Sequence, residues 1–127
     1  MKLFLPEPGS ASVAQRIAAS TTRTTSIVSM VEVPRAAARR GSPITAAGVR
    51  RKVGRMVVIG LHRSVVVAAG GQEPPGLRSL DAIHLASALE LGPELDAFLT
   101  YDRRLAIAAR DLGLPVESPG VDIWASP

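Results

Sequence analysis

Two aspartates, Asp81 and Asp102, lie where a carboxylate could bind a cation at the start of a helix. Asp81 comes two residues after Ser79, a suitable N-cap, and so falls in the first helical turn, where the helix dipole stabilises a charged carboxylate. Asp102 follows the short apolar segment 97–100, which has the composition of a buried strand, and precedes a helical pattern. Because ligands of open α/β sheets bind at the carboxyl ends of strands, we expect both aspartates to converge in an acidic, cation-binding site.

Glu32 is a third acidic candidate, for which two roles compete. Ser29 and Glu32 have the S-x-x-E spacing of a capping box, in which the glutamate bonds back to the N-cap amide. On spacing alone, capping is the favoured interpretation. Stabilisation of a helix start is also the alternative to a functional role for Asp81 and Asp102, since acidic residues are common at that position.

Three neighbouring side chains are weaker candidates for the same site. Thr100 could hydrogen-bond a carboxylate or a bound water at the strand end, and Arg78 could either approach a phosphate or be an exposed loop charge. His84 lies three residues after Asp81 on the same helix face, where we favour a packed histidine over a metal ligand. With two histidines and no cysteine, zinc is disfavoured, whereas clustered carboxylates suit Mg²⁺ or Mn²⁺.

The elements that must position these residues alternate between helix and strand, which predicts an α/β fold with a parallel sheet covered by helices. Helical patterns cover residues 10–19, 29–40, 44–53, 80–91 and 105–112, and strand patterns cover 26–28, 56–61, 97–100 and a segment near 116. Gly41 is expected to end the second helix. The segment 64–69 is too short and too β-branched to assign, and 70–76 is a loop by composition.

Bulk composition agrees with one small domain in a reducing compartment. The 127 residues leave room for a single core, and the absence of cysteine is compatible with a cytoplasmic location, which we predict. No apolar run is long enough for a signal peptide or a membrane span.

Fifteen basic and eleven acidic residues give a net charge of +4, and arginine dominates the basic set. Arginine favours bidentate contact with phosphate, so RNA is a plausible partner, although a solvated basic surface has the same composition.

The densest basic cluster is a candidate RNA-binding surface, and it consists of Arg50, Arg51, Lys52 and Arg55. The alternative is a solvated helix face. Because no aromatic residues interleave with these charges, base stacking is not expected there.

Several segments resemble a known family. The sequences LRSLDAIHLASAL at 77–89 and LTYDRRLAIAARDLGLPV at 99–116 resemble the C-terminal half of PIN-domain ribonucleases, specifically the VapC toxins of bacterial type II toxin–antitoxin pairs. Residues 26–36 resemble the strand-to-helix segment that carries the family's glutamate, and residues 1–8 resemble the segment just after its first strand. The resemblance implies a PIN-like three-layer fold, with a central parallel sheet flanked by helices, in a single domain over 1–127.

The same resemblance implies a chemistry. Glu32, Asp81 and Asp102 match the family's catalytic and metal-binding positions, so we expect them to hold Mg²⁺, or Mn²⁺, for the hydrolysis of an RNA phosphodiester. For Glu32, this reverses the preference for capping. The implied partners are RNA, a cognate antitoxin whose C-terminal segment blocks the acidic cleft, and a second copy of the chain in a homodimer.

One departure from the family concerns the N-terminus. The family begins with a central strand that ends in a catalytic aspartate, and this sequence starts after it, so we expect an N-terminally incomplete domain without its first central strand. Either Met1 is an internal methionine of a longer protein, or the chain is a truncated copy with little nuclease activity. A catalytically inactive protein that only binds antitoxin or RNA is therefore the alternative function. A receiver-like regulatory domain is disfavoured because the only lysines are Lys2 and Lys52.

Overall fold

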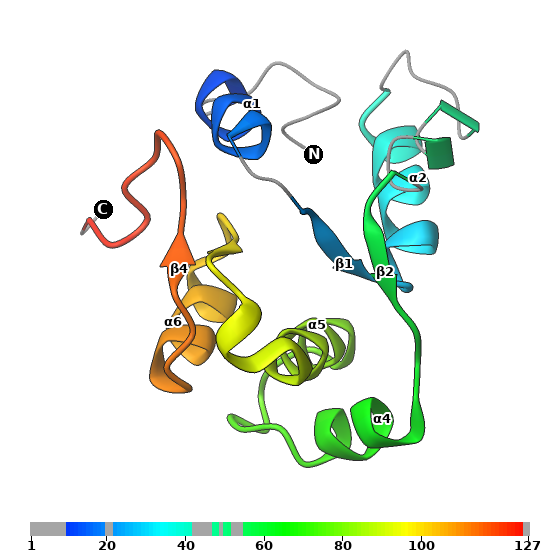
Figure 1. Ribbon diagram of the computed structural model, residues 1–127, viewed down its shortest axis with the longest axis vertical. Helices are drawn as coiled ribbons and strands as arrows, with labels where there is room; N and C mark the ends of the chain where they lie inside the picture. The colour runs from blue at the N-terminus through cyan, green and yellow to red at the C-terminus, as the bar shows by residue number, and fades with distance from the viewer. Residues whose placement is uncertain (1–9, 20–21, 42–46, 49, 52–54, 126–127) are drawn as a thin grey trace. The chain divides into compact units, whose positions relative to one another are not determined.

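The computed structural model describes residues 10–19, 22–41, 47–48, 50–51 and 55–125 (Figure 1). These residues fall into two compact units that divide after Gly60. In each unit, the described strands form one two-stranded parallel sheet, and a helix lies between the two paired strands along the chain. The α/β prediction is therefore confirmed. Among the residues described, none of the helices has the length and apolar character needed to span a lipid bilayer.

The first unit contains the helices α1 (Ser10–Ala18) and α2 (Ser29–Arg39) and the strands β1 (Thr24–Ser26) and β2 (Val57–Ile59). β1 and β2 pair in parallel, with Thr24 opposite Val57 and Ser26 opposite Ile59. Gly41 has a φ of +68°, a left-handed conformation that favours glycine, and follows the end of α2 as predicted. Of the predicted helix 44–53, residues 47–48 and 50–51 are helical, and the rest lies outside the described residues, as does the segment 1–8.

The junction between β1 and α2 differs from the sequence prediction in two ways. The strand ends at Ser26 rather than Val28, because the Ser26 hydroxyl accepts the Val28 N–H at 3.4 Å and turns the chain. Val28 already has helical angles (φ −62°, ψ −23°) and occupies the N-cap position, so Ser29 is not the N-cap that the capping-box alternative requires. Ser29 is instead buried, and its hydroxyl hydrogen-bonds the Thr25 hydroxyl at 2.7 Å.

The second unit contains three α-helices, a short 3-10 helix and two strands. Their bounds are α4 (Arg63–Gly70), α5 (Ser79–Leu91), η1 (Gly92–Glu94), β3 (Phe98–Leu99), α6 (Arg103–Asp111) and β4 (Val116–Glu117). β3 pairs in parallel with β4, and Phe98 lies opposite Val116. A parallel pair needs a crossover connection, which α6 supplies. Asp102 therefore stands between the end of a strand and the start of a helix, as the sequence predicts.

Two local features of this unit were not predicted. The unassigned segment 64–69 belongs to α4, which packs along α5 and buries Val65, so tertiary packing outweighs the low helix propensity of its valines. The Ser64 hydroxyl donates to the Glu90 carboxylate at 2.6 Å and links the two helices. At the start of α5, Arg78 occupies the N-cap position and Ser79 is the first helical residue, so the prediction of a Ser79 cap is wrong.

A buried cluster joins α5 to α6. Its members are aliphatic or small, namely Leu85, Ala88, Leu105, Ala108, Ala109 and Leu114, and Phe98 and Val116 of the strand pair pack against them. These residues come from α5, from α6 and from the segment that leads from α6 to β4. The cluster therefore fixes the start of α5 relative to the start of α6.

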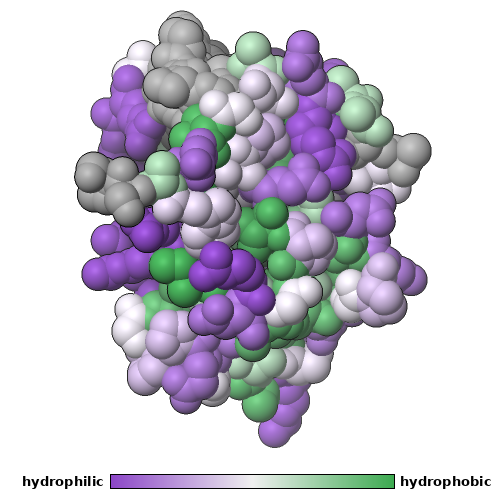
Figure 2. Space-filling view, turned by 90° about the vertical axis from the view of Figure 1, so that its left-hand side faces the viewer, coloured by the Kyte–Doolittle hydropathy of each residue, from purple (hydrophilic) through white to green (hydrophobic). Residues whose placement is uncertain are grey.

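Apolar side chains also reach the surface in both units. The most exposed large ones are Val67, Val31, Val57, Val66 and Leu61. On the face that Figure 2 draws, apolar side chains form small areas that polar side chains interrupt. Scattered exposure of this kind is usual for folded proteins and requires no covering partner.

We predict that Leu85→Ala destabilises the protein far more than Leu89→Ala, although the two positions are one turn apart on α5. Leu85 is fully buried in the cluster, so its truncation leaves a cavity and costs about 2–5 kcal/mol. Leu89 is 38% exposed and serves as the matched control. Urea unfolding followed by circular dichroism measures the difference, and equal losses for both variants would contradict the assigned core.

Candidate active site

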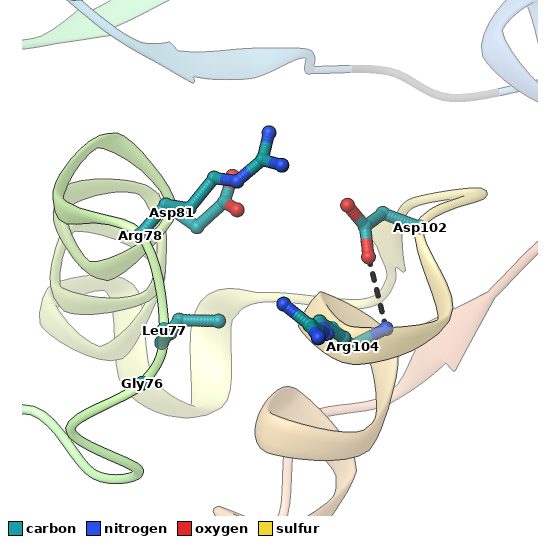
Figure 3. A pocket seen from close by; sticks show the side chains of 6 residues that line it. All are labelled: Gly76, Leu77, Arg78, Asp81, Asp102 and Arg104. Atoms are coloured by element: carbon teal, nitrogen blue, oxygen red, sulfur yellow. Dashed lines mark hydrogen bonds between the residues drawn. The ribbon is translucent and has the colours of Figure 1, made fainter.

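A pocket of about 290 Å³ lies at the starts of α5 and α6, wholly within the second unit (Figure 3). It is lined by Gly76, Leu77, Arg78, Asp81, Asp102 and Arg104. The structure therefore brings Asp81 and Asp102 to one pocket, although 21 positions separate them in the sequence. Figure 3 shows the two carboxylates turned into the same space from opposite sides.

The Asp102 carboxylate is held by the start of α6. Asp102 is the N-cap, and its Oδ1 accepts the backbone N–H of Arg104 at 2.9 Å and of Leu105 at 3.2 Å. Both hydrogen bonds end on Oδ1, and Figure 3 shows the other carboxylate oxygen directed toward the Asp81 side of the pocket. One oxygen thus fixes the side chain, while the second faces the pocket.

Thr100 positions Asp102 through its backbone. Its hydroxyl accepts the Asp102 N–H at 3.1 Å, and its own N–H donates to the Glu117 carbonyl of β4 at 3.1 Å. Thr100 is only 9% exposed, so these bonds lie at the edge of the core. In this hydrogen bond the hydroxyl oxygen is the acceptor, and donation of the hydroxyl proton to a carboxylate or a water stays a prediction.

Asp81 lies in the first turn of α5 and is half-buried. Arg78, which was a weaker candidate, is exposed at the N-cap position and lines the same pocket. His84 is half-buried one turn further along α5 and is not among the residues that line the pocket.

Arg104 is a pocket residue that sequence reasoning missed. It is the second residue of α6 and is exposed, and Figure 3 shows its side chain extending into the pocket toward Leu77. The pair Arg103–Arg104 was visible in the sequence as two charges after Asp102. Which of the two faces the pocket depends on how α6 packs against α5, and the local sequence does not specify this packing.

Glu32 belongs to the first unit, where it is half-buried in the first turn of α2. The loop that leads into α2 resembles the loop that leads into α6, because in each a buried hydroxyl near the strand end accepts a backbone N–H two residues later. In the first unit this pair is Ser26 and Val28, and in the second it is Thr100 and Asp102. In the described part of the second unit, two acidic side chains, rather than a group of three, meet at the pocket.

The predicted basic cluster also lies in the first unit. Arg50 and Arg51 are exposed on a helical segment, and Arg55 is exposed in a turn. Lys52 lies outside the described residues. Both a solvated helix face and an RNA-binding face would have exposed side chains, so exposure does not distinguish them. The RNA-binding role of the cluster stays a prediction.

Comparisons with known proteins agree with the resemblance seen in the sequence. The family model described as the PIN domain matches residues 1–111. Ribonuclease VapC46 of Mycobacterium tuberculosis strain H37Rv is 37% identical over 119 residues, which cover 94% of this chain and 91% of the relative. Ribonuclease VapC47 of strain CDC 1551 is 36% identical over 123 residues, covering 94% and 90%, and Ribonuclease VapC35 is 40% identical over 98 residues, covering 76% and 72%. No solved structure matches the chain.

The N-cap of α6 leads to a stability prediction. Asp102→Ala removes the acceptor for two backbone N–H groups and should destabilise the protein by about 0.5–2 kcal/mol. Asp102→Asn keeps a side-chain carbonyl oxygen at the cap and should unfold close to the wild-type urea midpoint. If the asparagine variant were as unstable as the alanine variant, the loss would stem from the charge and not from the cap.

Proposed function

Because the chain belongs to the PIN-domain family and is of its VapC type, we propose that it is an endoribonuclease that hydrolyses RNA phosphodiester bonds at a magnesium site. The observation that carries this proposal is the convergence of Asp81 and Asp102 on one pocket. Both lie at helix starts that a shared core holds in place. Two such carboxylates are a natural pair of ligands for a divalent cation.

The donor set fits Mg²⁺ or Mn²⁺ better than zinc. Carboxylate oxygens are hard ligands, and the pocket offers neither cysteine nor histidine. Mg²⁺ often binds through one or two carboxylates and keeps several waters and substrate oxygens in its shell, so two protein ligands suffice to anchor it. We propose Asp81 and the second oxygen of Asp102 as these ligands, acting directly or through water, and the metal-binding role of Glu32 stays a prediction of the resemblance.

The roles of the side chains follow from charge. A phosphodiester and two carboxylates repel one another, so the pocket accepts RNA only when a cation lies between them. When bound, the cation acidifies an attacking water and neutralises charge on the leaving oxygen. Asp102 contributes a fixed oxygen, because Oδ1 is held by α6 and the backbone is held by Thr100. Neither aspartate has to act as a nucleophile.

We further propose that the chain is the toxin of a type II toxin–antitoxin pair and that its substrate is structured or messenger RNA. The support is its similarity to relatives named as VapC ribonucleases. A cognate antitoxin would inhibit the enzyme by covering the acidic pocket. Assembly into a homodimer stays a prediction.

We predict that Asp81→Asn and Asp102→Asn each lower the rate of Mg²⁺-dependent RNA cleavage by at least about 100-fold. Each removes one charged ligand, and loss of several kcal/mol of transition-state stabilisation corresponds to this factor. Asp111→Asn is the matched control, because Asp111 is exposed at the opposite end of α6 and should leave the rate unchanged. Gel analysis of a labelled RNA measures all three, and wild-type rates in both pocket variants would exclude this site.

Metal dependence is a separate prediction. EDTA should abolish RNA cleavage, and Mg²⁺ or Mn²⁺ should restore it, whereas Zn²⁺ should not, because the pocket lacks nitrogen and sulfur donors. Cleavage that persists in EDTA would contradict a metal-dependent reaction. RNA binding without cleavage, insensitive to Asp81→Asn, would favour a binding module instead.

A further inference from the structure

Two arginines share the pocket with the two aspartates. Arg78 comes from the start of α5 and Arg104 from the start of α6, so each helix contributes one acid and one guanidinium. Both arginines are exposed, and Figure 3 shows the Arg104 side chain reaching across the pocket below the carboxylate pair. A site that only bound a cation would not need positive side chains beside its ligands.

At the start of α6, three of the backbone amides that could bind a phosphate already donate hydrogen bonds within the chain. Free N–H groups at a helix N-terminus are common anion sites. Here the N–H groups of Arg104 and Leu105 already donate to Asp102 Oδ1, and the Asp102 N–H donates to Thr100. This use of the amides favours recognition of a phosphate by side chains at this end of the pocket.

The formal charges of the pocket side chains also favour binding of a phosphate. Two carboxylates and two guanidiniums have a formal sum of zero, so one divalent cation gives the lined pocket a charge of about +2. That charge complements the phosphates of an RNA strand. Arginine is suited to this role because its planar guanidinium donates two parallel hydrogen bonds to phosphate oxygens.

We propose that Arg104, assisted by Arg78, binds a phosphate of the RNA substrate beside the two aspartates. The proposal rests on the proposed function, since it names how the same pocket holds its substrate. Arg104 and Arg78 approach from the two helices that line the pocket, so they hold the strand against the metal ligands. In this proposal the aspartates act in catalysis, and the arginines contribute to substrate affinity.

The first test measures affinity without cleavage. A fluorescein-labelled single-stranded RNA with nuclease-resistant linkages is titrated with protein at a fixed Mg²⁺ concentration, and anisotropy gives Kd at several salt concentrations. Arg104→Ala should weaken binding about 10-fold and reduce the slope of log K against log salt by about 0.7, the value for one lost phosphate contact on a single strand. Arg103→Ala is the matched control, because Arg103 neighbours Arg104 on α6, is exposed and does not line the pocket. It should change Kd less than twofold.

The second test separates affinity from catalysis. In Mg²⁺, Arg104→Ala should raise KM about 10-fold with little change in kcat, whereas Asp81→Asn should lower kcat. Arg104→Lys should recover part of the affinity, since lysine keeps the charge and loses the planar fork. Urea midpoints equal to wild type for the arginine variants would establish that the fold is intact.

The outcomes distinguish this inference from the proposed function. If the wild type cleaves RNA, Asp81→Asn does not, and Arg104→Ala has the same KM and salt slope as Arg103→Ala, the arginine proposal is overturned and the nuclease assignment stands. If cleavage never depends on Asp81 but RNA affinity depends on Arg104, the phosphate site stands and the nuclease assignment fails.

Discussion

The packing of α5 against α6 is the interaction on which the pocket depends. Ala88 on one helix and Ala108 and Ala109 on the other are buried in a shared cluster. Asp81 and Asp102 each lie about one turn before a buried leucine of this cluster. The separation of the two carboxylates is therefore set by an apolar contact. Helices that formed but packed differently would carry the same residues without making a site.

A second constraint fixes one carboxylate more firmly than helix packing alone. β3 is only two residues long, yet Thr100 at its end is tied to β4 by its N–H and to Asp102 by its hydroxyl. Asp102 in turn caps α6 with a single oxygen. The chain thus uses a stabilising feature, the helix cap, to orient a reactive group. The Asp102 side chain loses its conformational entropy when the protein folds, so little further entropy is lost when a cation binds.

Residue composition and periodicity near each position predicted those parts of the site that depend only on neighbouring residues in the sequence. Asp102 was placed at a strand end and a helix start because apolar composition and helical periodicity change there. Ser79 and Ser29 were assigned as caps by residue type, but the chain enters both helices one residue earlier than that rule requires. α4 was missed because its valines favour strands in isolation and are helical only when packed on α5. Arg104 was missed because its direction depends on contacts between helices that are distant in sequence.

The aspartates and the arginines of the pocket differ in side-chain length and in hydrogen bonding, and this difference argues for different roles. Asp102 has a short side chain with one oxygen hydrogen-bonded to the backbone, so its position varies little. Arg78 and Arg104 are long and exposed, so each can follow a phosphate over several ångströms. Metal ligation demands fixed oxygens, because coordination distances tolerate little error, whereas an RNA strand presents phosphates whose positions vary with sequence. A short, hydrogen-bonded Asp102 beside two long, exposed arginines meets both demands within one pocket.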